Sequence, residues 1–173
     1  MTDTNQTPIS DDIINDMINV IVEIPTGSLQ KIEWNPDTQT MEVDRVESII
    51  LPFPVNYGFI PQTISGDKDA LDVIIPTNDT IPTNTHLSVK IIGIMRFEDE
   101  GESDDKIVAV PTNEDEVNSL DDIPKSKLDQ INYFFNHYKD SKKPNTTIVK
   151  GWGDKEEAKE IIVKSIERWK NNK

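Results

Sequence analysis

Short β-type segments, separated by turn residues, constrain the fold of this chain more than any other feature of its sequence. Each segment is rich in apolar or β-branched residues, and Pro, Gly, Asn and Asp interrupt the series at short intervals. The expected strands are residues 19–24, 29–34, 41–44, 72–75, 87–95, 106–110 and 147–150. This spacing is typical of a small antiparallel sheet or barrel.

The last third of the chain changes to helical periodicity. Apolar side chains recur every three or four residues between Leu128 and Tyr138, which predicts a helix over residues 126–139. Asp154, with Glu157 three residues later, predicts a capping box at the start of a final helix. We therefore expect an α+β fold, an antiparallel β barrel with two flanking α-helices.

The chain length suits one domain. With 173 residues and no internal repeat or linker, residues 13–173 are expected to form a single domain, preceded by a disordered tail at residues 1–12. The start of the chain lacks the features of a signal peptide, and no apolar run is long enough to span a bilayer. These observations predict a soluble, cytoplasmic protein with no membrane partner.

Charge and cysteine content narrow the possible ligands. The formal net charge of -14 disfavours nucleic acid, because the phosphate backbone selects for excess Lys and Arg. The chain has no cysteine, so a metal ion would be held by oxygen atoms or by the two histidines. This donor set favours magnesium over zinc.

Two acidic segments are the candidate functional sites. Asp67, Asp69 and Asp72 fall within six residues, and unit charges ~4 Å apart repel by about 4 kcal/mol near a protein surface. From spacing alone, a metal site, shifted protonation and a solvated loop all remain open. An EF-hand is excluded, because Asp72 stands at the sixth position of the loop in place of glycine and Asn78 at the twelfth in place of glutamate.

The second acidic segment spans residues 98–105 and is expected to form a hairpin turn around Gly101. Asp99 and Asp104 would flank this turn, and Asp104 and Lys106, two residues apart, can point the same way. That orientation would place a cation beside a carboxylate on the side that faces a substrate. Taken alone, such a segment is more often a charged hairpin tip.

The order of several motifs resembles one known family. VEIPTGS, KIE, VDR, PFPVNYGFIP, DKDALDV, EDEGESDDKIVAVP, FFNHYKD and KGW follow one another as in the family I soluble inorganic pyrophosphatases. The resemblance runs from about residue 19 to the final helix. It implies an OB-like β barrel, a Mg²⁺-dependent enzyme of phosphate metabolism with several ions per active site, pyrophosphate as substrate, and a homo-oligomer, with a hexamer favoured.

The resemblance also implies roles for individual residues. Asp69 matches the general base for the attacking water, and Glu33 matches a supporting acid. The metal-binding positions of the family correspond here to Asp67, Asp72, Asp99, Asp104 and Glu23. The phosphate-binding positions correspond to Lys31, Arg45, Tyr57, Lys106, Tyr138 and Lys139.

Three residues depart from the family pattern. Lys68 and Ala70 occupy places in the acidic motif where a small or polar residue and proline are usual, and Phe53 stands where bacterial members often have tyrosine. Lys68 is expected to point outward, opposite its acidic neighbours. The alternative to an active enzyme is an inactive pyrophosphate-binding homologue, and the presence of every expected carboxylate argues against it.

Overall fold

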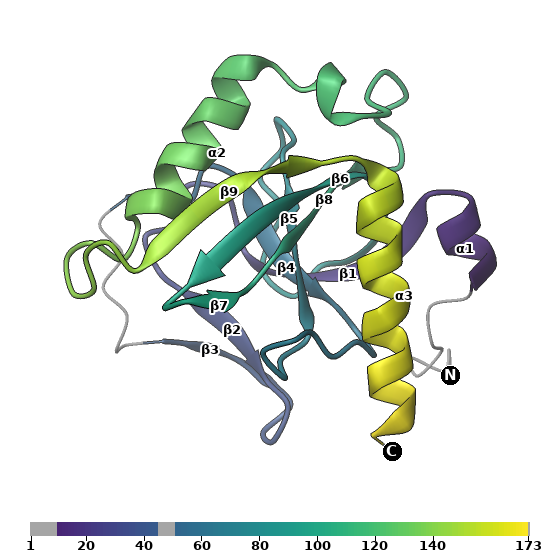
Figure 1. The fold of residues 1–173 in the computed structure, drawn as a ribbon, viewed down its shortest axis with the longest axis horizontal. Helices are drawn as coiled ribbons and strands as arrows, with labels where there is room; N and C mark the ends of the chain where they lie inside the picture. Colours follow the sequence, from purple (N-terminus) through teal and green to yellow (C-terminus); the bar gives the residue numbers. More distant parts are fainter. Residues whose placement is uncertain (1–9, 45–50, 173) are drawn as a thin grey trace.

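Five strands close into a barrel at the centre of the molecule (Figure 1). The computed structural model describes residues 10–44 and 51–172. Neighbours around the barrel follow the order β1 (Met17–Ile24), β4 (Asn56–Ile60), β5 (Leu71–Ile75), β8 (Lys106–Pro111) and β6 (His86–Asp99). β6 pairs in turn with β1, which completes the closure.

The other strands extend this barrel or lie beside it. β7 (Glu102–Ser103) and β9 (Thr147–Gly153) both pair with β6, while β2 (Ile32–Asn35) and β3 (Thr40–Val43) form a separate hairpin. The predicted OB-like barrel with flanking helices is confirmed. Its pairing is mixed, however, because β5 and β8 run parallel where antiparallel strands were expected. In the sequence, β6 lies between β5 and β8, and it pairs antiparallel with β8.

One short helix precedes the barrel strands in the sequence, and the other helices belong to the last third of the chain. They are α1 (Ser10–Ile14), the short 3-10 helix η1 (Leu120–Asp122), α2 (Lys125–His137) and α3 (Lys155–Asn171). Asp154 caps α3 as predicted, accepting a hydrogen bond of 3.0 Å from the backbone N–H of Glu157. The carboxylate of Glu157 faces Arg96 on β6, which donates to it at 2.9 and 3.0 Å.

Apolar side chains on the two faces of the strands form two buried clusters. Val73 and Ile75 of β5 pack in the cluster that includes α3, whereas Ile74 between them packs in the cluster that includes α2. Successive side chains of a strand point to opposite faces, so a strand covered on both faces needs an uninterrupted apolar run. The sequence of β5 meets that requirement.

Among the described residues, four elements were not predicted from the sequence: the strands β4 and β7 and the short helices α1 and η1. β4 carries Gly58 in its centre, and glycine in a strand normally weakens the strand. Here the glycine is required by packing, since a Cβ at residue 58 would lie 2.2 Å from the carbonyl oxygen of Ile21. α1 includes residues 10–12, the last three of the predicted tail; residues 1–9 lie outside the described part of the chain.

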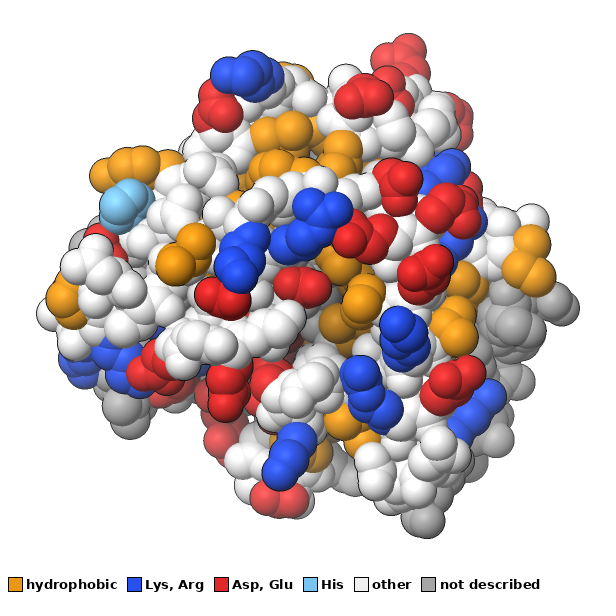
Figure 2. Space-filling view, in the orientation of Figure 1, with side chains coloured by type: hydrophobic (Ala, Val, Ile, Leu, Met, Phe, Trp, Pro, Cys, Tyr) orange, Lys and Arg blue, Asp and Glu red, His pale blue; other side chains and the backbone are white. Residues whose placement is uncertain are grey.

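Most acidic side chains are spread over the surface. On the face formed by β6, β9 and α3, Figure 2 shows them interspersed with Lys and Arg. Within residues 10–44 and 51–172, no helix combines the length and apolar character needed to cross a bilayer.

Gly58→Ala is expected to destabilise the barrel by about 3 kcal/mol, because backbone atoms of β1 would have to move to admit one methyl group. Urea unfolding of the two proteins measures the difference. Gly66→Ala is the matched control, since a Cβ at residue 66 meets nothing within 4 Å. Equal unfolding midpoints for Gly58→Ala and Gly66→Ala would contradict the packing argument.

Candidate active site

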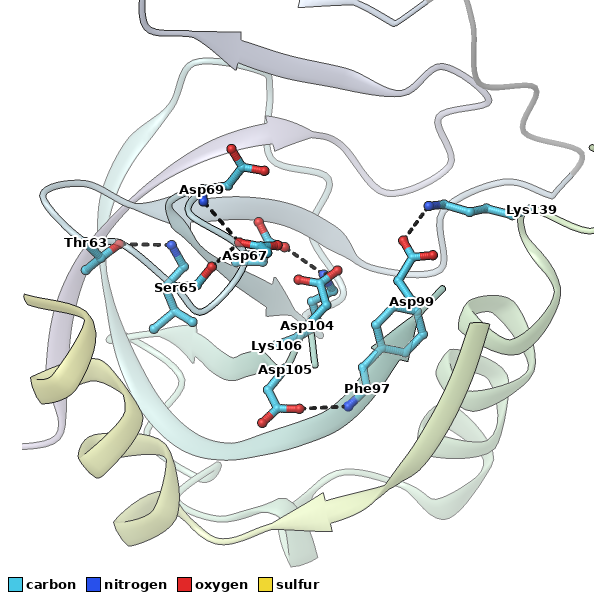
Figure 3. Close-up of polar contacts among 12 residues, drawn as sticks. Thr63, Ser65, Asp67, Asp69, Phe97, Asp99, Asp104, Asp105, Lys106 and Lys139 are labelled. Carbon is cyan, nitrogen blue, oxygen red and sulfur yellow. Dashed lines mark hydrogen bonds and ion pairs between the residues drawn. The ribbon is translucent and has the colours of Figure 1, made fainter. Parts of the chain in front are cut away.

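Carboxylates from separate segments meet a buried lysine on one side of the barrel (Figure 3). Lys106, the first residue of β8, is 2% exposed, and its ammonium nitrogen lies 2.7 Å from Asp72 Oδ2 and 2.7 Å from Asp104 Oδ2. The prediction that Asp104 and Lys106 point the same way is confirmed. Lys106 therefore joins the two acidic segments.

Strand register brings these groups together. Val73 of β5 stands opposite Ile107 of β8 in the parallel pairing, so the preceding residues, Asp72 and Lys106, are also neighbours. Asp104 precedes Lys106 by two residues, and side chains two apart in an extended chain share a face. The parallel pairing is thus what places Asp72 beside the lysine.

Burial shifts the pKa values of Asp104 and Lys106. Burial raises the pKa of Asp104 to about 7, with Lys106 opposing the rise and Asp72 adding to it. For Lys106, burial lowers the pKa, but Asp72 and Asp104 outweigh it and the net shift is upward. The ammonium group therefore stays charged.

The loop between β4 and β5 presents the remaining acids of the first segment. Asp67 Oδ1 accepts hydrogen bonds from the Ser65 hydroxyl and, at 3.0 Å, from the backbone N–H of Asp69. Lys68 has a φ of 75°, so the chain turns at this point and is not extended. Its side chain is exposed, as expected for an outward orientation.

Asp69 lies at the exposed edge of this loop. Its partial burial raises the pKa of the carboxyl group, and the charges of Asp67 and Asp72 raise it further. A carboxylate with a raised pKa that water can reach is a better proton acceptor than an ordinary aspartate.

Glu23 on β1 is the most deeply buried of the predicted metal ligands. It is 7% exposed, and its Oε2 accepts a hydrogen bond of 2.8 Å from the backbone N–H of Trp34. Burial raises the pKa of Glu23 to about 8; the hydrogen bond from Trp34 opposes the rise, and the charge of Asp72 adds to it.

A second lysine–carboxylate pair lies next to the first. Lys139, which is 8% exposed, contacts Asp99 Oδ2 at 2.5 Å. Asp99 Oδ1 is buried and has no hydrogen-bond partner among the described residues. The ring centroid of Tyr138 lies 5.6 Å from the ammonium nitrogen of Lys139. Burial and the charges of Asp99, Asp104 and Asp72 raise the pKa of the Tyr138 hydroxyl, whereas Lys106 lowers it.

Of two neighbouring aromatic residues, Tyr57 lies beside Lys106, whose ammonium nitrogen is 5.6 Å from the ring centroid, whereas Phe53 belongs to the apolar core. Burial, together with the charges of Asp72 and Asp104, raises the pKa of the Tyr57 hydroxyl. Phe53, one of the departures from the family pattern, is buried with its ring centroid 4.6 Å from that of Phe134. The ring of Phe53 therefore serves the apolar core.

The remaining predicted residues lie toward the edge of the site or beyond the described chain. Lys31 is paired with Asp44 at 3.5 Å, and Glu33 is exposed on β2. Both still act on the site through charge, since Lys31 lowers and Glu33 raises the pKa of Glu23. Arg45 lies outside the described residues.

The donor chemistry of the site suits a hard cation. Every predicted ligand is a carboxylate, and the buried Asp99 Oδ1 has an unmet capacity to accept. Within the described part of the chain, no three of these acids already converge as a complete ligand set. Asp72 and Asp104 converge on Lys106 instead.

Two polar residues that fix loops of the structure, Ser65 within the site and Asn56 outside it, were missed in the sequence. Ser65 donates to Asp67, and the Ser-x-Asp spacing is the signal that predicts such a contact. Asn56 is fully buried, and its side chain bonds the backbone of Thr26, Asp79 and Ile81. No local pattern identifies Asn56, because its partners are distant in the sequence.

Comparison with known proteins finds one consistent group. A family profile described as "Inorganic pyrophosphatase" matches residues 20–170. Proteins named inorganic pyrophosphatase from Neisseria meningitidis and Haemophilus influenzae are each 49% identical over 98% of this chain and 98% of their own length. A crystal structure of an inorganic pyrophosphatase from Neisseria gonorrhoeae superposes with a TM-score of 0.90 at 46% identity, covering 97% of this chain and 99% of that one.

Lys106→Met is expected to lower the free energy of unfolding by about 3 kcal/mol at pH 8 in EDTA, because Asp72 and Asp104 would lose their shared counterion. Urea unfolding is the measurement. Lys125→Met is the matched control: Lys125 is 91% exposed, and its contact with Asp129 is 3.4 Å long, so a change below about 0.5 kcal/mol is expected. A loss from Lys106→Met as small as the control's would contradict the buried-pair interpretation.

Proposed function

Because this chain belongs to the inorganic pyrophosphatase family, we propose that the cluster around Lys106 is where it hydrolyses pyrophosphate with the help of Mg²⁺. The reaction is the hydrolysis of inorganic pyrophosphate to two orthophosphates, and the family uses divalent metal ions. The choice of magnesium and the roles of individual residues are our proposal. The observation that carries it is the contact of Lys106 with both Asp72 and Asp104 at 2.7 Å.

Carboxylates supply the metal-binding part of the proposed site. Asp67, Asp72 and Asp104 would hold the tighter ion, with Asp99 and Glu23 serving further ions. When bound, Mg²⁺ neutralises phosphate charge and lowers the pKa of coordinated water. The burial of these side chains limits their hydration, which strengthens their attraction for a cation.

Cations and hydroxyl groups supply the substrate-binding part. Lys106 and Lys139 are both buried and both lie beside acids, so their ammonium groups are held in fixed positions. Tyr57 and Tyr138 have raised pKa values and therefore stay protonated as hydrogen-bond donors. Lys31 would bind phosphate from the outer edge, and Arg45, which lies outside the described residues, is proposed as a further phosphate-binding residue. Such groups offset the negative charge that otherwise repels an attacking water.

Asp69 is the proposed proton acceptor. As the oxygen of the attacking water bonds to one phosphorus atom, the bond from that phosphorus to the bridging oxygen breaks, and a proton from the water passes to Asp69. The raised pKa and exposed position of Asp69 suit this role. Glu33, exposed nearby on β2, would support the charge balance.

An inactive pyrophosphate-binding homologue is the alternative that the sequence left open. No observation favours it. Lys68 departs from the family pattern and would weaken metal binding if its charge pointed into the site, but its side chain is exposed.

Association into a homo-oligomer, with a hexamer favoured, and a cytoplasmic location complete the proposal. Tyr133 on α2 and Ile148 on β9 are 60% and 50% exposed, and apolar side chains of this kind are suited to contacts between subunits. Light scattering is expected to give about six times the chain mass of 19.6 kDa. A monomeric mass would contradict the oligomer, and recovery of the protein in a membrane fraction would contradict the location.

Phosphate release from pyrophosphate is expected to require magnesium chloride and to stop in EDTA. Asp69→Asn should reduce kcat at least about 100-fold, because it removes the proton acceptor. Asp72→Asn should abolish release, because it removes a metal ligand. Asp129→Asn, an exposed change on α2, is the control and should leave the rate unaltered. Magnesium-independent release, or full activity of both site variants, would refute the proposed site.

A further inference from the structure

The loop between β4 and β5 contains a hydroxyl group to which neither the family resemblance nor the proposed reaction assigns a role. We propose that Ser65 is a positioning residue that fixes the carboxylate of Asp67 in the orientation needed to bind Mg²⁺. This inference rests on the proposed metal site.

Ser65 makes contacts at three of its atoms within the acidic loop. Its hydroxyl donates to Asp67 Oδ1, its backbone N–H donates to the carbonyl of Asp69 at 2.7 Å, and its carbonyl accepts from the N–H of Lys68 at 3.1 Å. The Asp67 Oδ1 atom also accepts from the N–H of Asp69 at 3.0 Å. One carboxylate oxygen therefore has two donors, and the orientation of the other oxygen follows from them.

The loop has separate anchors that do not involve the Ser65 hydroxyl. Thr63, which is 4% exposed, donates to the carbonyl of Ile60 at the end of β4 and accepts from the N–H of Leu71 at the start of β5. The N–H of Ile64 donates to the carbonyl of Ser165 on α3 at 3.0 Å. Removing the Ser65 hydroxyl should therefore leave Asp67 Oδ1 with a single donor, the N–H of Asp69, without releasing the loop.

The same hydrogen bonds couple the proposed ligand to the proposed proton acceptor. The carboxylate of Asp67 accepts from the N–H of Asp69, and the carbonyl of Asp69 accepts from the N–H of Ser65. Because the Ser65 hydroxyl donates to Asp67, the three hydrogen bonds form a closed ring. Figure 3 shows Ser65 and Asp69 on either side of the Asp67 carboxylate. A hydroxyl at residue 65 holds this arrangement without adding charge to it.

The affinity for magnesium depends on how its ligands are oriented. It demands near-ideal octahedral geometry, so a carboxylate that can rotate must be ordered each time the ion binds. Groups that hydrogen-bond to a metal ligand typically account for 10- to 100-fold in metal affinity or activity. A serine hydroxyl bonded to one carboxylate oxygen belongs at the lower end of that range.

The test compares Ser65→Ala and Ser65→Thr with the wild-type protein by titrating magnesium chloride alone and following the unfolding temperature. Ser65→Ala is expected to bind magnesium about tenfold more weakly, while its unfolding temperature in EDTA stays close to that of the wild type. Ser65→Thr keeps the hydroxyl and should recover most of the affinity. Ser28→Ala is the matched control, because the Ser28 hydroxyl contacts only the backbone of Gln30 among the described residues.

The outcomes distinguish a failure of this inference alone from a failure of the proposed metal site. Equal magnesium affinity for Ser65→Ala and wild type would overturn the positioning role and leave the metal site intact. A loss of stability in EDTA as large as the loss in magnesium would also overturn it, since the hydroxyl would then serve the fold alone. A wild-type protein whose unfolding does not respond to magnesium would overturn the proposed metal site and this inference together.

Discussion

The ammonium group of Lys106, held between Asp72 and Asp104, sets how charge is balanced in the candidate site. Two carboxylates and one ammonium group lie together at the wall of an apolar barrel, where neither an isolated acid nor an isolated lysine would be tolerated in its charged form. Above the pKa of Asp104, which burial raises to about 7, the trio carries an excess negative charge. The same arrangement that stabilises the lysine therefore leaves the site attractive to further cations.

The barrel imposes this arrangement through strand pairing. β5 brings Asp72, β8 brings Lys106, and the hairpin before β8 brings Asp104, so the trio depends on one parallel register. Gly58 matters for the same reason, because its bare backbone lets β4 approach β1 and so places β5 correctly. Site geometry is therefore a property of the whole barrel, while the loop from Ser65 to Asp69 adjusts only the direction of individual carboxylates.

The sequence predicted those parts of the molecule whose signals are local. The regular spacing of β-type segments predicted the barrel class, and helical periodicity predicted α2 and α3. The two-residue spacing of Asp104 and Lys106 correctly predicted their shared face. β4 was missed because Gly58 lowers its strand propensity, and its need for glycine arises from contact with the distant Ile21. The parallel pairing of β5 with β8 and the contacts of Asn56 likewise depend on where distant segments meet, whereas the contact of Ser65 with Asp67 is local and was overlooked. Site residues came from the family resemblance, since spacing alone did not distinguish a metal site from a solvated loop.

Strand β6 has a consequence for how this chain acquires its structure during synthesis. It pairs with β1, which is made earlier, and with β7, β8 and β9, which are made later. A nascent chain that ends before residue 86 can pair β1, β4 and β5, but it leaves the outer edges of β1 and β5 unpaired. Closure waits for β6 and β8, and the pairing of β6 with β9 waits for residue 153. The ribosome must therefore release most of the chain before the barrel can bury its edges, a step at which contacts distant in sequence govern the folding rate.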